Sequence, residues 1–158
     1  MAEARVGTRR CCEMTILIAD DDRVQVLLLS KHLMKKGIEV AGAYDAMQAF
    51  STVMKKPFDA VLLDINMPAG TGYEVLRRMR ASLRTSLIPV VVISGSIRAD
   101  EEEKVRALGA DGFLKKPVDL EQLDRVLAGL LGAPEAPGQA GMPAGGQVLS
   151  QGLPDPGL

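Results

Sequence analysis

Residues 60–68 have the sequence AVLLDINMP, in which a short apolar run ends on a carboxylate, Asp64, before a loop that contains a proline. A continuous apolar run of this length is typical of a parallel strand that is buried on both faces. The aspartate follows at the carboxyl end of that strand, which is the edge where open α/β sheets bind their ligands. The segment therefore predicts a buried strand with a chemically useful group at its end.

Three other apolar runs also end beside a polar side chain. The run TILIA precedes Asp20 and Asp21, PVVVI precedes Ser94, and GFLK precedes Lys116. If all four runs are parallel strands of one sheet, their carboxyl ends bring three carboxylates, a hydroxyl and an ammonium to one edge. This combination of groups predicts a site for a phosphate and a metal ion.

Apolar residues recur at helical spacing between these runs, so strands and helices are expected to alternate. The expected strands are residues 15–20, 38–44, 58–64, 88–94 and 110–116. The expected helices are residues 24–36, 46–56, 73–83, 98–109 and 118–132, with Asp45 and Asp119 as N-caps. In the first helix the apolar residues at helical spacing are Val24, Leu27, Leu28, Leu33 and Met34. Five strand–helix pairs predict a parallel sheet with helices on both faces, because each crossover is right-handed and returns to the same sheet.

The composition changes at both ends of this pattern. Residues 133–158 are dominated by Pro, Gly and Ala, and such a segment cannot bury enough apolar surface to offset its ordering entropy. We expect a disordered tail there, a globular domain over residues 14–132, and a flexible extension over residues 1–13. Cys11 and Cys12 lie in that extension; adjacent cysteines form only a strained disulfide, so free thiols are expected.

Size and charge exclude several classes of function. A net charge of -1 gives no electrostatic footprint for nucleic-acid binding. No apolar stretch approaches the roughly 18–20 residues that span a bilayer, and the first residues lack the apolar core of a secretory signal. The sequence predicts a cytoplasmic protein without direct membrane or nucleic-acid contact.

The acidic pair Asp20-Asp21, the motif DINMP, the strand-end Ser94 and the pair Lys116-Pro117 occur in this order along the strand–helix alternation. In these features the chain resembles the receiver domain of two-component response regulators, over roughly residues 14–131. The resemblance implies a flavodoxin-like fold, which is a doubly wound five-stranded parallel sheet with strand order 2-1-3-4-5. It also implies a phosphoacceptor signalling domain rather than an enzyme.

The resemblance assigns a role to each acidic residue. Asp64 matches the phosphoacceptor, which takes a phosphoryl group from a phosphohistidine on a sensor histidine kinase or a histidine phosphotransfer protein. Three carboxylates within a few ångströms repel by several kcal/mol per pair at an effective dielectric of about 20, so the site is expected to need a divalent cation. In the family this is Mg²⁺, held by Asp21, Asp64 and the backbone carbonyl at the position of Asn66, with Asp20 acting through water.

Lys116 matches the lysine that pairs first with Asp64 and then with the phosphoryl oxygens. Lys115 is the alternative, but adjacent strand residues point to opposite sides of the sheet, and the family's lysine directly precedes the proline. The bond between Lys116 and Pro117 is often cis in the family.

The resemblance also identifies two switch residues. Ser94 matches the hydroxyl that turns toward the bound phosphoryl group, and Phe113 lies where the family has the aromatic residue that follows this movement. Phenylalanine in place of tyrosine keeps the bulk and loses the hydroxyl. In the loop after the acceptor strand, Thr71 replaces a frequent acid, and Gly72 suits a turn that needs permissive backbone angles.

Several alternatives remain open. A haloacid-dehalogenase-like phosphatase would use Asp20 as the nucleophile and Asp22 as the acid/base. A pseudo-receiver would keep the fold and serve only as an interaction module. The chain could also be the receiver part of a longer regulator; we favour a stand-alone receiver that acts on a downstream protein, as a monomer or as a phosphorylation-dependent dimer. His32 is expected to be solvated on the first helix and not to be a phosphodonor.

Overall fold

The computed structural model describes residues 14–95 and 98–132. The flexible extension predicted over residues 1–13, with Cys11 and Cys12, and the tail predicted over residues 133–158 lie outside the described residues. None of the helices in the described part is long and apolar enough to cross a membrane.

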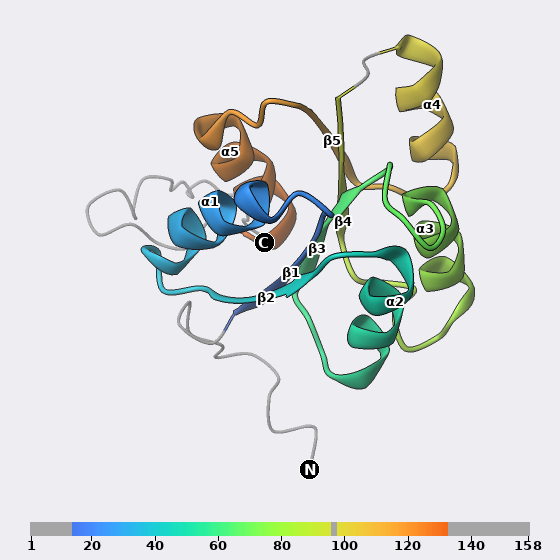
Figure 1. Ribbon diagram of the computed structural model, residues 1–158, viewed down its shortest axis with the longest axis horizontal. Coiled ribbons are helices and arrows are strands. Elements are labelled where there is room, and N and C mark those ends of the chain that lie inside the picture. Colours follow the sequence, from blue (N-terminus) through green and yellow to red (C-terminus); the bar gives the residue numbers. More distant parts are fainter. Residues whose placement is uncertain (1–13, 96–97, 133–158) are drawn as a thin grey trace, which may run out of the picture.

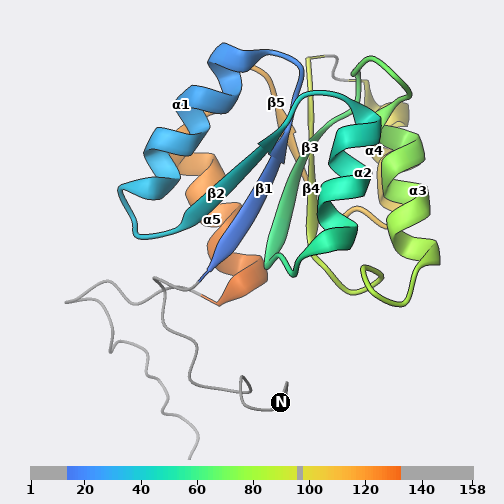
Figure 2. The same ribbon diagram turned by 60° about the horizontal axis from the view of Figure 1, so that its bottom comes forward.

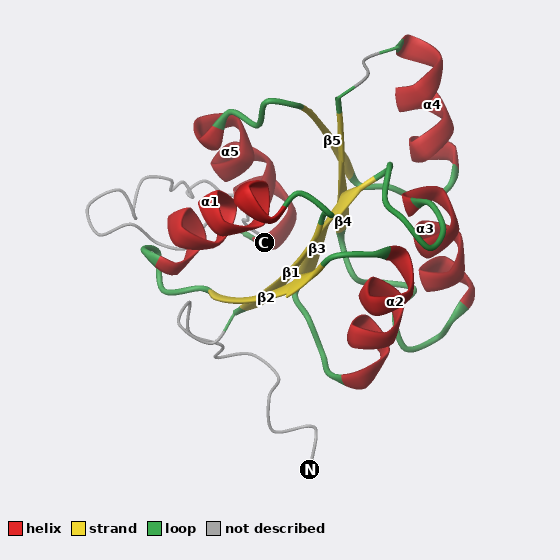
Figure 3. Cartoon of the chain, viewed as in Figure 1, coloured by secondary structure: helices red, strands yellow, loops and turns green. Residues whose placement is uncertain are grey.

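All five strands are parallel and belong to one sheet, whose order is β2-β1-β3-β4-β5. The strands are β1 (Thr15–Ala19), β2 (Glu39–Ala43), β3 (Ala60–Asp64), β4 (Val90–Ser94) and β5 (Gly112–Lys115). Figure 1 follows the chain through them, and Figure 3 shows the twisted sheet passing between two sets of helices. The predicted strand order is confirmed.

Five helices alternate with the strands. They are α1 (Arg23–Met34), α2 (Ala46–Lys55), α3 (Gly72–Ala81), α4 (Ala99–Ala107) and α5 (Leu120–Leu131). Helices α1 and α5 cover one face of the sheet, and α2, α3 and α4 cover the other (Figure 2). This confirms the predicted doubly wound α/β fold, in which right-handed crossovers place helices on both faces.

Strands β3, at the middle of the sheet, and β4, beside it, are buried at every residue. Alternate residues face opposite layers: Leu63 and Val92 pack in the cluster with α2, α3 and α4, whereas Leu62 and Ile93 pack in the cluster with α1 and α5. A strand covered on both faces needs apolar residues at every position. This explains why AVLLD and VVVIS are continuous apolar runs that end on one polar residue.

Helix α1 turns a different face to the core than its apolar spacing indicated. The helix buries Val26, Leu29 and Leu33. Four of the five apolar residues that recur at helical spacing are between 54% and 65% exposed: Val24, Leu27, Leu28 and Met34. The helix is apolar on two opposite sides, so periodicity alone allowed two orientations, and the packing of α1 on the sheet selects one.

The prediction that His32 is solvated is wrong, because its side chain is half-buried against α5. Its Nε2 lies 2.8 Å from Asp124 Oδ1, and Lys36 Nζ lies 3.4 Å from the other oxygen of the same carboxylate. Asp124 belongs to α5, so these contacts join α5 to α1 and to the turn that follows α1, on the same face of the sheet. They connect residues far apart in the sequence, which a pattern within one helix does not reveal.

We expect Leu29→Ala and Leu28→Ala to differ sharply in stability. Leu29 is 1% exposed and Leu28 is 56% exposed. Truncating the buried leucine removes packing and leaves a cavity, so it should lower the free energy of unfolding by about 2–5 kcal/mol. The exposed leucine should change it by about 0.5 kcal/mol or less. Urea unfolding measures both changes, provided that the m-value is the same in the parent and in the variants. Equal losses of unfolding free energy in the two variants would contradict the observed orientation of α1.

Candidate metal and phosphate site

The polar residues at the strand ends meet at the carboxyl edge of the sheet. Asp20 follows β1, Asp64 ends β3, Ser94 ends β4, and Lys116 follows β5. Because β1 pairs with β3, β3 with β4, and β4 with β5, these strand ends are neighbours in space. Asp20, Asp64 and Ser94 are buried, whereas Asp21 is exposed.

Three carboxylates form a cluster at this edge. Asp20, Asp21 and Asp64 each present an oxygen, and the three oxygens lie within 4.8 Å of one another. Asp20 Oδ2 is buried and accepts no hydrogen bond from the described residues. Its charge partner is the ammonium of Lys116 at 3.2 Å, which also pairs with Asp64, so the three carboxylates keep an excess of negative charge that a cation would balance. Hard oxygen ligands of this kind fit Mg²⁺, so the residues present suit the ion that the sequence predicts.

The three aspartates that follow β1 make different contacts. Asp20 Oδ1 accepts a hydrogen bond of 2.9 Å from the backbone N–H of Asp22. Asp22 is the N-cap of α1, and its Oδ1 accepts bonds from the N–H groups of Val24 and Gln25. Capping accounts for Asp22 without the acid/base chemistry of the phosphatase alternative. Asp20, which is buried, and Asp21, which is exposed, are the two aspartates of this run that belong to the carboxylate cluster.

Lys116 lies between two of the carboxylates. Its Nζ is 3.2 Å from Asp20 Oδ2, a charge contact whose angles do not make a hydrogen bond, and 3.4 Å from Asp64 Oδ2, to which it donates. The backbone N–H of Lys116 donates to the carbonyl of Ser94 and so continues the pairing of β4 with β5. Lys115, the alternative, is exposed. The Lys116–Pro117 bond is cis, as the resemblance implied.

Burial and like charge make Asp64 reluctant to ionise in the absence of a cation. Burial and, next, the charge of Asp20 raise the pKa of Asp64, Lys116 and the N–H of Asn66 act against the rise, and the net pKa is about 6. Burial lowers the pKa of Lys116, but the charges of Asp20 and Asp64 outweigh this effect and the net pKa is raised. One ammonium is therefore shared by two buried carboxylates, and the site carries excess negative charge.

The loop after Asp64 is shaped by close packing against the end of β3. A Cβ added at Gly72 would lie 2.4 Å from the carbonyl oxygen of Asp64, so only glycine fits. We expected Gly72 to supply permissive backbone angles, but the positive φ values of this loop belong to Ala69 and Gly70. Thr71 caps α3 by accepting a hydrogen bond from the N–H of Glu74. The Thr-x-x-Glu spacing was a signal for this cap that the sequence interpretation did not use.

The remaining predicted residues surround the carboxylates. The N–H of Asn66 donates to Asp64 Oδ1 at 3.2 Å, so Asn66 begins the loop directly beside this carboxylate. Ser94 is fully buried. Phe113 is half-buried on β5, opposite Val92 of β4, and packs against the core cluster that includes Val105 of α4. Phe113 thus packs on the sheet face that α2, α3 and α4 cover, and β4 separates its strand from β3, which carries Asp64.

We expect the metal-free protein to lose stability as the pH rises through the pKa of Asp64. That pKa is about 6 in the folded chain and 3.8 in the reference state. The folded state therefore binds more protons between these values, and the free energy of unfolding falls with rising pH in this window. Asp64→Asn removes the charge and should stabilise the metal-free protein at pH 7 by about 1–3 kcal/mol.

Urea unfolding in EDTA at several pH values between 4 and 7 measures this effect, with Asp100→Asn as a matched control at an exposed position. The control should keep the slope of the parent protein. A steeper loss of stability in Asp64→Asn than in the parent would contradict the assigned cause.

Comparisons with known proteins agree with this geometry. The model of the response regulator receiver domain family matches residues 16–128. Response regulator GtcR of Aneurinibacillus migulanus is 34% identical over 117 residues, which are 73% of this chain and 47% of that protein. The chain spans about half, or less, of the length of the curated relatives that it matches.

Solved structures show the same fold. Chemotaxis protein CheY4 of Vibrio cholerae superposes with a TM-score of 0.71 at 29% identity, over 75% of this chain and 98% of that one. The receiver domain of sensor histidine kinase PA1611 of Pseudomonas aeruginosa, solved with a magnesium ion coordinated in its active site cleft, superposes with a TM-score of 0.70 at 25% identity, over 76% of this chain and 98% of that one. The acidic cluster resembles such a magnesium site. The chain therefore belongs to the response regulator receiver domain family.

Proposed function

We propose that this chain accepts a phosphoryl group on Asp64 from a phosphohistidine donor in a Mg²⁺-dependent reaction, and that the resulting change of conformation controls a protein partner. One observation carries the proposal: a buried carboxylate at the end of β3 lies within reach of one ammonium and two further carboxylates. A structural ion pair needs one acid for one base. The excess of acids suits a site that handles a cation and an anionic substrate.

The transfer is a displacement at phosphorus. An oxygen of ionised Asp64 attacks, the O–P bond forms while the N–P bond of the phosphohistidine breaks, and the electron pair of that bond returns to the imidazole nitrogen. Lys116 turns from Asp64 toward the phosphoryl oxygens and balances their charge, a change of partner that suits a compact ammonium on a flexible stem. Asp64 is thus the acceptor and Lys116 the counter-charge.

Asp21, Asp64 and the backbone carbonyl of Asn66 would hold Mg²⁺, with Asp20 acting through water. When bound, Mg²⁺ neutralises the carboxylates and the incoming phosphoryl oxygens. This neutralisation favours the ionised form of Asp64, whose pKa is raised by burial and by the charge of Asp20.

The switch begins at Ser94, whose hydroxyl bonds the new phosphoryl group, and Phe113 follows it. Helix α4 is the element best suited to move, because Val105 is the one residue of this fully described helix that is buried. The helix is tied to α3 by Tyr73, whose hydroxyl donates to Glu101 at 3.1 Å and whose ring lies under Lys104. These contacts are exposed enough to break at low cost, so phosphorylation can shift the population of α4 positions.

The donor is a sensor histidine kinase or a histidine phosphotransfer protein. Helix α1 begins immediately after the acidic run, so its exposed apolar residues adjoin the acceptor edge and offer a docking face to the donor. The chain acts in the cytoplasm, as a monomer or as a phosphorylation-dependent dimer, with residues 14–132 as the working domain.

The receiver part of a longer regulator is the second candidate, and it is favoured by the greater length of relatives such as GtcR. The match to nearly the whole CheY4 chain supports the stand-alone form instead.

We expect a small acyl phosphate to label Asp64 in the presence of Mg²⁺. Borohydride reduction followed by peptide mapping identifies the labelled residue. Asp64→Asn should abolish the label and EDTA should prevent it, whereas Asp22→Asn, which alters only the cap of α1, should keep it. Label on Asp20 instead of Asp64 would contradict the proposal and favour a haloacid-dehalogenase-like phosphatase.

Beryllofluoride with Mg²⁺ should act as a stable mimic of the phosphoryl group. We expect the amide NMR signals of Ser94, Phe113 and α4 to shift, and the shifts in α4 to shrink strongly in Ser94→Ala, because the hydroxyl no longer links the acceptor to the helix. Signals of β2, at the far edge of the sheet, serve as the internal control. An unchanged spectrum at Ser94 and Phe113 would instead favour a pseudo-receiver.

A further inference from the structure

A second concave site lies at the end of the molecule opposite to Asp64. It is a hollow of about 280 Å³ between the end of α2 and the loop that joins α3 to β4. Its lining residues are Val53, Met54, Lys55, Lys56, Pro57, Arg84 and Ile88. Pro57 precedes β3 and Ile88 precedes β4, so the hollow lies at the amino ends of the strands whose carboxyl ends carry Asp64 and Ser94.

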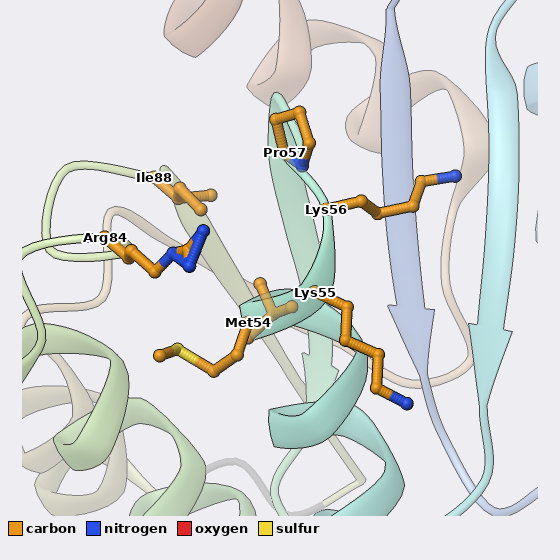
Figure 4. A pocket seen from close by; sticks show the side chains of 7 residues that line it. Met54, Lys55, Lys56, Pro57, Arg84 and Ile88 are labelled. Atoms are coloured by element: carbon orange, nitrogen blue, oxygen red, sulfur yellow. The ribbon is translucent and has the colours of Figure 1, made fainter.

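The hollow combines apolar walls with a cationic rim. Figure 4 shows Met54, Pro57 and Ile88 around it; Arg84 reaches toward it from one side, and Lys55 and Lys56 stand on the other side with their ammonium ends directed away. Lys56 Nζ also lies 5.4 Å from the centre of the Phe58 ring. Among the ion pairs between described residues, none involves Lys55, Lys56 or Arg84. No acidic side chain in the described part of the chain neutralises these three cations, so Lys55 and Arg84 can pair with a ligand, and Lys56 can do so by leaving the ring of Phe58.

The loop on the Arg84 side adds two exposed apolar side chains and is held in place. Leu83 is 97% exposed and Leu87 is 92% exposed, on either side of Arg84 in the sequence. Arg80 of α3 fixes this loop, because its guanidinium donates to the carbonyl oxygens of Thr85, Ser86 and Ile88. A surface that is ordered before binding loses less entropy when a partner arrives.

We propose that this hollow binds an acidic peptide segment of a partner protein, with one large aliphatic or aromatic side chain inserted between α2 and the loop. The apolar walls take the anchor side chain, and the cations on opposite sides of it attract flanking Asp or Glu residues. The exposed leucines extend the apolar contact beyond the hollow. Cations on both sides of a concave site fit a peptide better than a flat anionic membrane, which would need them on one plane.

The position of this acidic-peptide site makes it independent of the acceptor. It shares no residue with the carboxylate cluster and lies at the other edge of the sheet. Partner binding there therefore tethers the receiver in both phosphorylation states. The proposed control of a partner through α4 is a separate event on a separate surface.

The test is a selection from a displayed library of random 12-residue peptides, followed by fluorescence anisotropy with the enriched peptides. We expect enriched sequences to place Asp or Glu on both sides of a Leu, Met, Phe or Trp. The variant Lys55→Glu/Arg84→Glu should weaken their binding by about tenfold or more. The control Lys31→Glu/Lys35→Glu makes the same charge change at two exposed positions, one in α1 and one directly after it. It should leave the peptide affinity within about twofold of that of the parent protein.

Two further measurements separate this site from the acceptor. Peptide affinity should be the same with and without beryllofluoride, and Lys55→Glu/Arg84→Glu should still be labelled on Asp64 by acyl phosphate. Enrichment of non-acidic peptides, no enrichment above background, or equal loss in the control variant would overturn the proposal. Co-sedimentation with phosphatidylglycerol vesicles that requires Leu83 and Leu87, without peptide binding, would overturn it in favour of a membrane surface.

Discussion

The repulsion among Asp20, Asp21 and Asp64 is the constraint on which the rest of this structure depends. Their oxygens lie within 4.8 Å of one another, and two of the three carboxylates are buried. Lys116 offsets part of this negative charge. A proton on Asp64 or a bound cation offsets the rest. The apolar strands beneath, β3 and β4, supply the packing that holds these groups together despite their repulsion.

Most of this arrangement could be predicted from the sequence because the signals are local. A continuous apolar run identifies a strand buried on both faces, and the first polar residue after it marks the carboxyl edge. For this reason the sequence predicts that Asp64, Ser94 and the pair at 20 and 21 lie at this edge of the sheet, as they do. Alternation along a strand, together with the following proline, also separated Lys116 from Lys115.

The features that the sequence did not reveal are those set by contacts between distant segments. Helix α1 has two apolar faces, and only its packing on the sheet decides that Leu29 is buried and Leu28 is exposed. The pairing of His32 with Asp124 and the need for glycine at position 72 depend on neighbours elsewhere in the chain or on the path of the backbone. The hollow beside α2 likewise exists only because two loops meet.

Arg80 has a consequence for how the length of this chain can vary. Its guanidinium reaches the loop before β4 and also the loop before β5, where it bonds the carbonyl of Gly109 and the carboxylate of Asp111. A rigid planar group satisfies both loops only at their present lengths. An inserted or deleted residue in either loop would leave partly buried donors without acceptors. Grafted tags and reporter peptides will therefore be tolerated in other loops more readily than in these two.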